Sequence, residues 1–95
     1  MNDESLVSDA SNLLKLMADP TRLRIVMHLR QGASAVTDIA QALGMEQSAV
    51  SHQLSRLLAG GLVTNRRDGK RIHYRLADHH VKRILVAALE HAGEG

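Results

Sequence analysis

The chain has 95 residues with 12 basic and 10 acidic side chains, a formal net charge of +2, which is enough for one small domain whose core would be marginal alone. The absence of cysteine excludes disulfides, thiolate metal sites and thiol switches, and the single aromatic residue, Tyr74, argues against modules that stack single-stranded bases. No apolar run approaches a membrane span, and acidic Asp3 and Glu4 stand where a signal peptide would be positive, so we expect a cytoplasmic protein.

The first third of the chain is predicted to form two helices. Leucine and methionine recur at helical spacing from about residue 4 to residue 17. Asp19 then supplies a capping side chain before Pro20, which is well tolerated at the first position of a helix, and this second helix stops near Gly32. Because the core must be almost entirely aliphatic, helices are favoured over a β-sandwich.

Two further helices are predicted on either side of a glycine turn. The first starts at Val36 or Thr37 and ends at Gly44, and the second opens at Glu46 or Gln47. The second helix keeps its leucines on one face and small polar side chains on the other, a pattern typical of the recognition helix in a helix-turn-helix. An ordinary helical hairpin has the same pattern, so the following segment decides between the two.

A basic β-hairpin follows. Residues 62–67 and 70–76 flank Asp68-Gly69, a favoured two-residue turn in which both positions take positive φ. Alternate residues of the second strand are apolar, so one face packs inward and the other is basic, although a solvated hairpin would also explain the charge. Beside a recognition helix in the major groove, this hairpin is predicted to be a wing whose arginines reach phosphates or the minor groove. The predicted DNA-contacting residues are Gln47, Ser48, Ser51, His52, Arg56, Arg66, Arg67, Lys70 and Arg71.

The last predicted helix, residues 78–94, carries a carboxylate and an imidazole at each end. The step from His80 to His91 turns a helix only about 20° past three full turns, so both imidazoles lie on one stripe, but it separates them by about 16 Å. One chain therefore cannot close a metal site. If two helices pair antiparallel about a two-fold axis, Asp78 and His80 come opposite His91 and Glu94 of the other chain, which gives two equivalent sites. Capping by Asp78 and solvation of the other side chains is the alternative interpretation.

The sequence resembles the ArsR/SmtB family of winged-helix metalloregulatory repressors over its full length, 1–95. The matching segments are ADPTRLRI at 18–25, SAVSHQL at 48–54 and YRL at 74–76. The resemblance implies a mainly α winged helix-turn-helix homodimer, joined through its first and last helices. It also implies binding to an inverted-repeat operator in double-stranded DNA and release when metal arrives. One metal site of the family uses a cysteine where this chain has Ala35, so that site is expected to be absent.

The family's other site follows the pattern Asp-x-His, ten residues, His-x-x-Glu, and the resemblance assigns its ligands to Asp78, His80, His91 and Glu94. A nitrogen and oxygen donor set favours Zn²⁺, with Co²⁺ second and Ni²⁺ third. The resemblance also implies that the ligating histidine bonds a backbone carbonyl at the end of the recognition helix, here that of Gly61.

Two other functions remain open. A metal-independent regulator of the same family would share the DNA-binding half and use Asp78 and His91 only for capping and dimer packing. An enzyme with a metal-activated water would need an open coordination position, and four protein ligands leave none, so we do not expect an enzyme.

Overall fold

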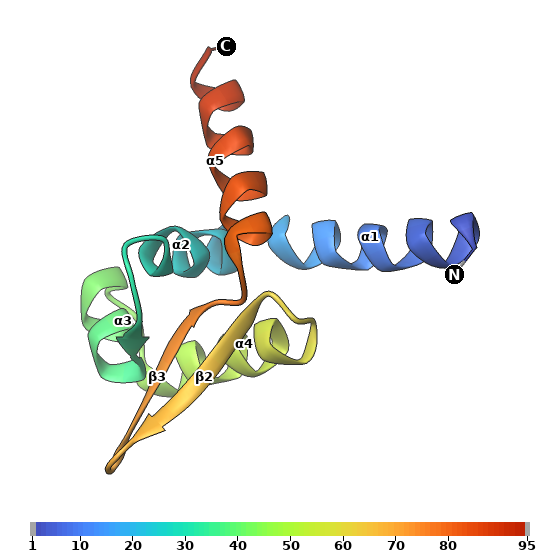
Figure 1. Ribbon diagram of the computed structural model, residues 1–95. Coiled ribbons are helices and arrows are strands. Elements are labelled where there is room, and N and C mark those ends of the chain that lie inside the picture. The colour runs from blue at the N-terminus through green and yellow to red at the C-terminus, as the bar shows by residue number, and fades with distance from the viewer. Residues whose placement is uncertain (1, 95) are drawn as a thin grey trace.

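The computed structural model describes residues 2–94, so positions 1 and 95 of the predicted 1–95 domain lie outside the described residues. The described part contains five helices and three strands, and it confirms the predicted mainly α winged helix-turn-helix (Figure 1). The elements in chain order are α1 (Asp3–Met17), α2 (Pro20–Leu29), β1 (Ser34–Ala35), α3 (Val36–Leu43), α4 (Gln47–Ala59), β2 (Val63–Asp68), β3 (Arg71–Leu76) and α5 (His79–Glu94).

Two aspartates cap the N-termini of helices, as the sequence predicts. An Asp19 carboxylate oxygen accepts a hydrogen bond from the backbone N–H of Arg22 at 3.0 Å, and Pro20 occupies the first position of α2. An Asp78 oxygen accepts from the backbone N–H of Val81 at 3.1 Å at the start of α5. Each carboxylate satisfies an N–H that has no partner within its helix.

The sheet contains a strand that sequence patterning did not predict. The strand order is β1-β3-β2, and all neighbours are antiparallel. β1 has only two residues, with Ser34 opposite Tyr74 and Ala35 opposite His73. Two residues are too few to show an alternating pattern, and this pairing exists only because the wing folds back against the segment before α3.

The turn of the wing differs from the prediction. Asp68 is the last residue of β2 and pairs with Arg71, so the two turn residues are Gly69 and Lys70 rather than Asp68 and Gly69. No non-glycine residue in the described range 2–94 has positive φ, whereas Gly69 has a φ of 65°. Glycine at the first of two central positions fits a type II′ turn, in which only that residue needs positive φ.

The core lies among α2, α3, α4, β2 and the first half of α5, with Met17 added from the end of α1. It is aliphatic, as the composition predicts. Its side chains with no measurable exposure include Ile25, Val26, Ile39, Val50, Leu54, Leu57, Leu62 and Leu85.

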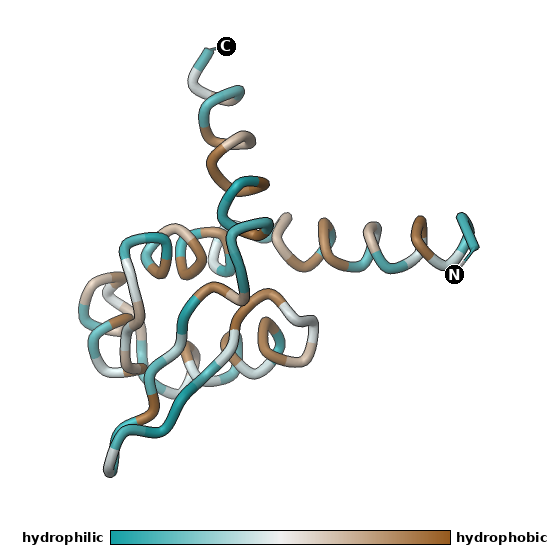
Figure 2. Tube along the Cα trace, in the orientation of Figure 1, coloured by the Kyte–Doolittle hydropathy of each residue, from teal (hydrophilic) through white to brown (hydrophobic). Residues whose placement is uncertain are grey.

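Two helices leave this core. Figure 1 shows most of α1 and of α5 projecting from the body in different directions. The Cα radius of gyration is 13.9 Å, against about 12 Å for a compact chain of this length. Large apolar residues on the projecting helices are exposed, namely Leu6, Val7, Leu14 and Ile84. Figure 2 shows hydrophobic positions alternating with hydrophilic ones along both helices. Isolated apolar residues on a surface are ordinary, but among the described residues three exposed large apolar side chains lie on α1 and one on α5, which favours an interface with another molecule on these helices.

Candidate nucleic-acid interface and metal centre

The recognition helix α4 has one buried face and one exposed face. Val50, Leu54 and Leu57 are fully buried against the core. The left-handed conformation of Gly44, with φ of 65°, ends α3 and lets the chain turn into α4. The five side chains predicted to contact DNA from this helix are all exposed: Gln47, Ser48, Ser51, His52 and Arg56.

The outer face of the wing is more extensive than the predicted contact set. Arg66 lies opposite His73, and Thr64 lies opposite Arg75, so these side chains share one face of the hairpin. A shallow hollow lined by arginine, histidine and one aspartate opens on this face beside Ala33. Strand alternation places His73 and Arg75 on the same face as Arg71, and this signal could have added both to the predicted set.

Arg71, in contrast, is already engaged within the chain. One of its terminal nitrogens lies 3.2 Å from a carboxylate oxygen of Asp38 and 3.3 Å from the hydroxyl of Thr37, both in α3. The side chains of Arg71 and Asp38 are 56% and 57% exposed, so solvent screens the pair. Arg71 therefore joins the wing to the first helix of the helix-turn-helix, and half of its surface remains accessible.

The predicted metal ligands form two pairs at opposite ends of α5. His80 Nδ1 lies 3.6 Å from Asp78 Oδ1, and His91 Nδ1 lies 3.4 Å from Glu94 Oε2. All four side chains are at least half exposed. Within residues 2–94, no place brings together three or more potential metal ligands. A single chain thus offers two pairs, as the helical spacing predicts, and each pair needs further donors to enclose a cation.

The Asp78 carboxylate has a lowered pKa. The main cause is the hydrogen bond that it accepts from the N–H of Val81, and the nearby imidazole of His80 lowers the pKa further. A carboxylate has about four lone-pair positions. Capping α5 therefore leaves Asp78 with acceptor capacity for a cation.

The place of the family's cysteine-containing site has a different chemistry here. Ala35 is buried in β1, and the neighbouring Ser34 hydroxyl lies 3.2 Å from Nε2 of His28 in α2. His28 thus links α2 to β1. Because an alanine methyl cannot bind a cation, we do not expect a metal site in this region, and this expectation stays a prediction.

The segment after α4 turns through two glycines. Gly61 has a φ of 77°, and its N–H donates to the carbonyl of Leu58 at 3.1 Å. That φ is one that residues with side chains rarely adopt. The predicted link from His91 to the Gly61 carbonyl stays a prediction.

These features define a class of protein, the winged helix-turn-helix DNA-binding transcriptional regulators. Residues 19–65 match the family model described as "Bacterial regulatory protein, arsR family". The chain is 46% identical over 90 residues to the HTH-type transcriptional regulator NmtR of Mycobacterium tuberculosis, covering 95% of this chain and 75% of that protein. The chain therefore belongs to the ArsR family.

Other relatives agree. The transcriptional repressor SmtB of M. tuberculosis is 42% identical over 89 residues, which cover 94% of this chain and 66% of SmtB. The solution structure of a homodimeric winged helix-turn-helix DNA-binding domain from Mycobacterium bovis has a TM-score of 0.91 at 36% identity, covering 99% of this chain and 89% of that one. The solution structure of apo-NmtR has a TM-score of 0.85 at 43% identity, covering 100% of this chain and 80% of that one. No helix among the described residues is long and apolar enough to cross a membrane.

Proposed function

We propose that this protein is a metal-responsive repressor that binds an operator inverted repeat as a homodimer and leaves it when a divalent cation binds between paired C-terminal helices. The observation that carries the proposal is the pair of imidazole and carboxylate side chains at each end of α5, a helix that projects from the body with apolar side chains exposed. Such a repressor would act in the cytoplasm, where the chromosome lies.

Dimerisation would complete the site. We infer that α1 and α5 form the dimer interface, which covers Leu6, Val7, Leu14 and Ile84. Antiparallel pairing of two α5 helices would bring Asp78 and His80 of one protomer to His91 and Glu94 of the other. The homodimeric state of the M. bovis domain supports a dimer, and the assignment of α1 and α5 to its interface is part of the proposal.

The donor chemistry fits zinc. Two imidazole nitrogens and two carboxylate groups match the ligands that Zn²⁺ accepts in closed four-ligand sites, and the chain has no cysteine that would favour softer ions. A bound divalent cation would supply a positive centre shared by side chains of both protomers. Co²⁺ is the second candidate, and Ni²⁺, which prefers more ligands, is the third.

The dimer would read DNA through two elements. Helix α4 would enter the major groove with Ser48, Ser51 and His52 near the bases, while Arg66 and Arg67 of the wing would contact phosphates or the minor groove. Ligation at α5 would hold the two protomers in an arrangement that the operator does not favour. Metal and operator would then weaken each other's binding by the same factor.

A Co²⁺ titration of the protein, followed by visible absorption, tests the proposed site. We expect intense bands that saturate at one ion per protomer and disappear when Zn²⁺ is added, because four-coordinate sites with nitrogen and oxygen ligands suit both ions. The variant His80→Asn should lose the bands, whereas His79→Asn, a matched change one residue away, should keep them. Weak bands without saturation would contradict the tetrahedral site.

One observation favours a second candidate, a metal-independent regulator. The Asp78 carboxylate already caps α5 through Val81, so capping alone accounts for this residue. If Co²⁺ and Zn²⁺ fail to bind in a fixed ratio while operator binding persists, this second function is the correct one.

A further inference from the structure

Arg22 is a buried cation in a chain whose other buried side chains are almost all aliphatic. The residue is 8% exposed, and it is one of only two buried polar or charged residues within positions 2–94. Taking a guanidinium group out of water is costly unless hydrogen bonds and nearby charge compensate. The contacts of the Arg22 side chain therefore show what its burial contributes to the structure.

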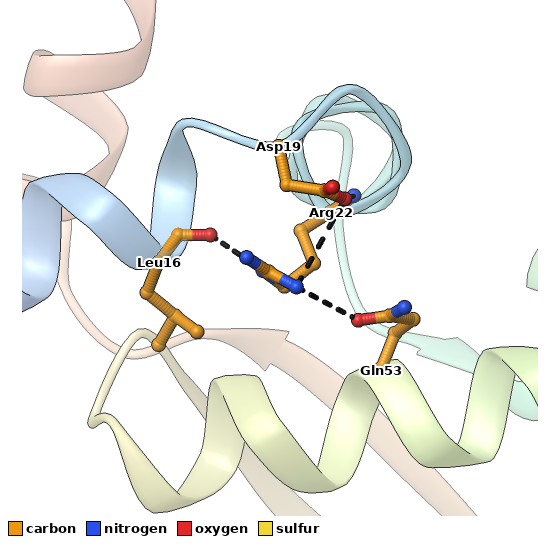
Figure 3. Close-up of polar contacts among 4 residues, drawn as sticks. All are labelled: Leu16, Asp19, Arg22 and Gln53. Atoms are coloured by element: carbon orange, nitrogen blue, oxygen red, sulfur yellow. Dashed lines mark hydrogen bonds and ion pairs between the residues drawn. The ribbon is translucent and has the colours of Figure 1, made fainter.

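The guanidinium group of Arg22 in α2 contacts two other helices, α1 and α4, and the aspartate that caps its own helix (Figure 3). Nε donates to the carbonyl of Leu16 in the last turn of α1 at 2.7 Å. Nη1 donates to Oε1 of Gln53 in α4 at 3.2 Å, and it lies 4.0 Å from a carboxylate oxygen of Asp19. Since Leu16 O belongs to the last turn of its helix, where carbonyls lack partners, Arg22 satisfies it and ties it to the middle of the recognition helix.

A second, independent contact joins the same two helices. Gly60, which follows α4, has an ordinary φ of −85°, so its backbone does not require glycine. A Cβ atom built at Gly60 would overlap Cδ2 of Leu16. That methyl is the end of a flexible side chain that can shift, so the close approach shows that Leu16 packs against Gly60 rather than that glycine is required there. Leu16 meets the recognition helix twice, at its middle through Arg22 and at its end through Gly60.

We propose that Leu16, Arg22, Gln53 and Gly60 form a joint, called here the α1–α4 joint, that sets the orientation of the recognition helix relative to α1. The inference rests on the proposed function, in which α4 reads DNA and α1 belongs to the dimer interface. Arg22 and Gln53 are then positioning residues, and they act on DNA recognition without contacting the bases.

Directionality is the physical reason for a polar joint. Val50, Leu54 and Leu57 hold α4 against the core through apolar contacts, which have little directional preference. A hydrogen bond weakens steeply as its angle departs from linear, so the bond between Arg22 and Gln53 resists rotation of α4 about its own axis. In a dimer bound to successive major grooves, the two recognition helices must lie about 34–36 Å apart. A joint between the dimer helix and α4 would set that separation.

The test compares Gln53→Leu with Gln53→Glu. Leucine removes the acceptor at similar size, and glutamate retains a carboxylate acceptor for Arg22 and so serves as the conservative rescue. Gln31→Leu, the same replacement at an exposed position outside α4, is the matched control. The probe is a duplex that the wild-type protein selects from a random-sequence library. It is compared with forms of the duplex that carry one or two base pairs inserted between the half-sites, and with an unrelated duplex at the same salt concentration.

We expect Gln53→Leu to bind the selected duplex about 10-fold more weakly, the low end for loss of a hydrogen bond to a charged group, while its affinity for the unrelated duplex changes less than about twofold. Its preference among the spacings should flatten, which a general loss of stability would not cause. Gln53→Glu and Gln31→Leu should keep the wild-type preference. Arg22→Lys should resemble Gln53→Leu, because an ammonium group cannot present the fixed planar donors of guanidinium.

Two results would overturn the proposal. One is a Gln53→Leu protein with wild-type affinity and spacing preference, and the other is an equal loss on the selected and unrelated duplexes. If the wild-type protein selects no duplex at all, both the proposed DNA recognition and this inference are wrong. A wild-type protein that selects a duplex which Gln53→Leu reads equally well leaves the proposed function intact and removes only the joint.

Discussion

The DNA-reading half of the molecule, from α2 to β3, is called here the reading half. It differs from the two projecting helices, α1 and α5, in whether a single chain can bury its apolar side chains and assemble its functional surface. In the reading half, one chain buries most of the large apolar side chains of α2, α3 and α4, and it presents the polar face of α4 and the basic wing on its surface. In α1 and α5, apolar side chains are exposed, and the four candidate ligands stand as two separate pairs.

The difference indicates two levels of assembly. A DNA-reading surface needs only short-range packing, which a single chain supplies. The candidate metal site needs residues about 16 Å apart on one straight helix, and no fold of that helix can join them. The projecting helices are therefore expected to acquire their function from a second copy of the chain, and altering each half should have distinguishable consequences.

The largest effect is expected in the core of the reading half. Leu54 is fully buried, so Leu54→Ala should lower the free energy of unfolding by about 2–5 kcal/mol through lost burial and the cavity left behind. Chemical denaturation measures this loss. Leu58→Ala, in the same helix but 38% exposed, is the control and should cost far less.

The same truncation on a projecting helix should act on association instead. Leu14 is 52% exposed, so Leu14→Ala should leave the secondary structure intact and weaken the dimer. Sedimentation equilibrium over a range of protein concentrations measures the dissociation constant of the dimer for the wild type and for Leu14→Ala. A monomeric wild-type protein, or a Leu14→Ala dimer of unchanged affinity, would contradict the assignment of α1 to the interface.

The next effect concerns communication between the two halves. With metal absent, His91→Asn should bind operator DNA like the wild type, because His91 is not among the residues of α4 and the wing that are predicted to contact DNA. Added Zn²⁺ should weaken operator binding by about 5-fold to 150-fold in the wild type, the usual range of allosteric coupling, and should have no effect on the variant. Fluorescence anisotropy measures both affinities. A metal response that survives in His91→Asn would remove this residue from the site.

A smaller effect is expected on the salt dependence of DNA binding, in which Arg66 and Arg71 of the wing should differ. Arg66→Gln should reduce the slope of log affinity against log salt concentration by about 1, because one phosphate contact and its released counterion are lost. Arg71→Gln should change the slope less, since Arg71 is paired with Asp38 in the free protein. Equal slopes for the two variants would mean that DNA displaces Asp38 from Arg71.

The smallest effect is a dependence of stability on pH. The pKa values of Asp19 and Asp78 lie below the ordinary carboxyl value of about 3.9. The main cause in both is a hydrogen bond that the carboxylate accepts from a backbone N–H group. A carboxyl group with a lower pKa in the folded state stabilises the fold above its unfolded pKa, and this contribution disappears as the pH falls through the folded value.

Asp19→Asn and Asp78→Asn should therefore each flatten the loss of stability below about pH 4, while the wild type loses stability there more steeply. Urea unfolding at a series of pH values from neutral to about 2 measures the slopes. Asp9→Asn, an exposed change within α1, provides the control. Identical slopes for all four proteins would show that neither cap contributes to the acid transition.

Local sequence signals located most of the elements. Asp19 and Pro20 predicted the start of α2, Gly44 predicted the end of α3, and alternation in the second strand predicted the wing. These signals succeed because capping, left-handed turns and strand alternation depend on residues only a few positions apart. The turn at Gly69 was misplaced by one residue, because Asp-Gly fits a type I′ turn as well as a strand end followed by a type II′ turn.

By itself, the sequence determined the winged helix-turn-helix, its family and the placing of two candidate ligand pairs at opposite ends of α5, too far apart to meet in one chain. Only the tertiary structure revealed strand β1, the pairing of Arg71 with Asp38 and the contacts of Arg22 with Leu16 and Gln53. The partners of Arg71 lie 33 and 34 positions away, and Gln53 lies 31 positions from Arg22. Contacts across such distances depend on how helices and hairpin pack in space, which no local pattern of residue types encodes.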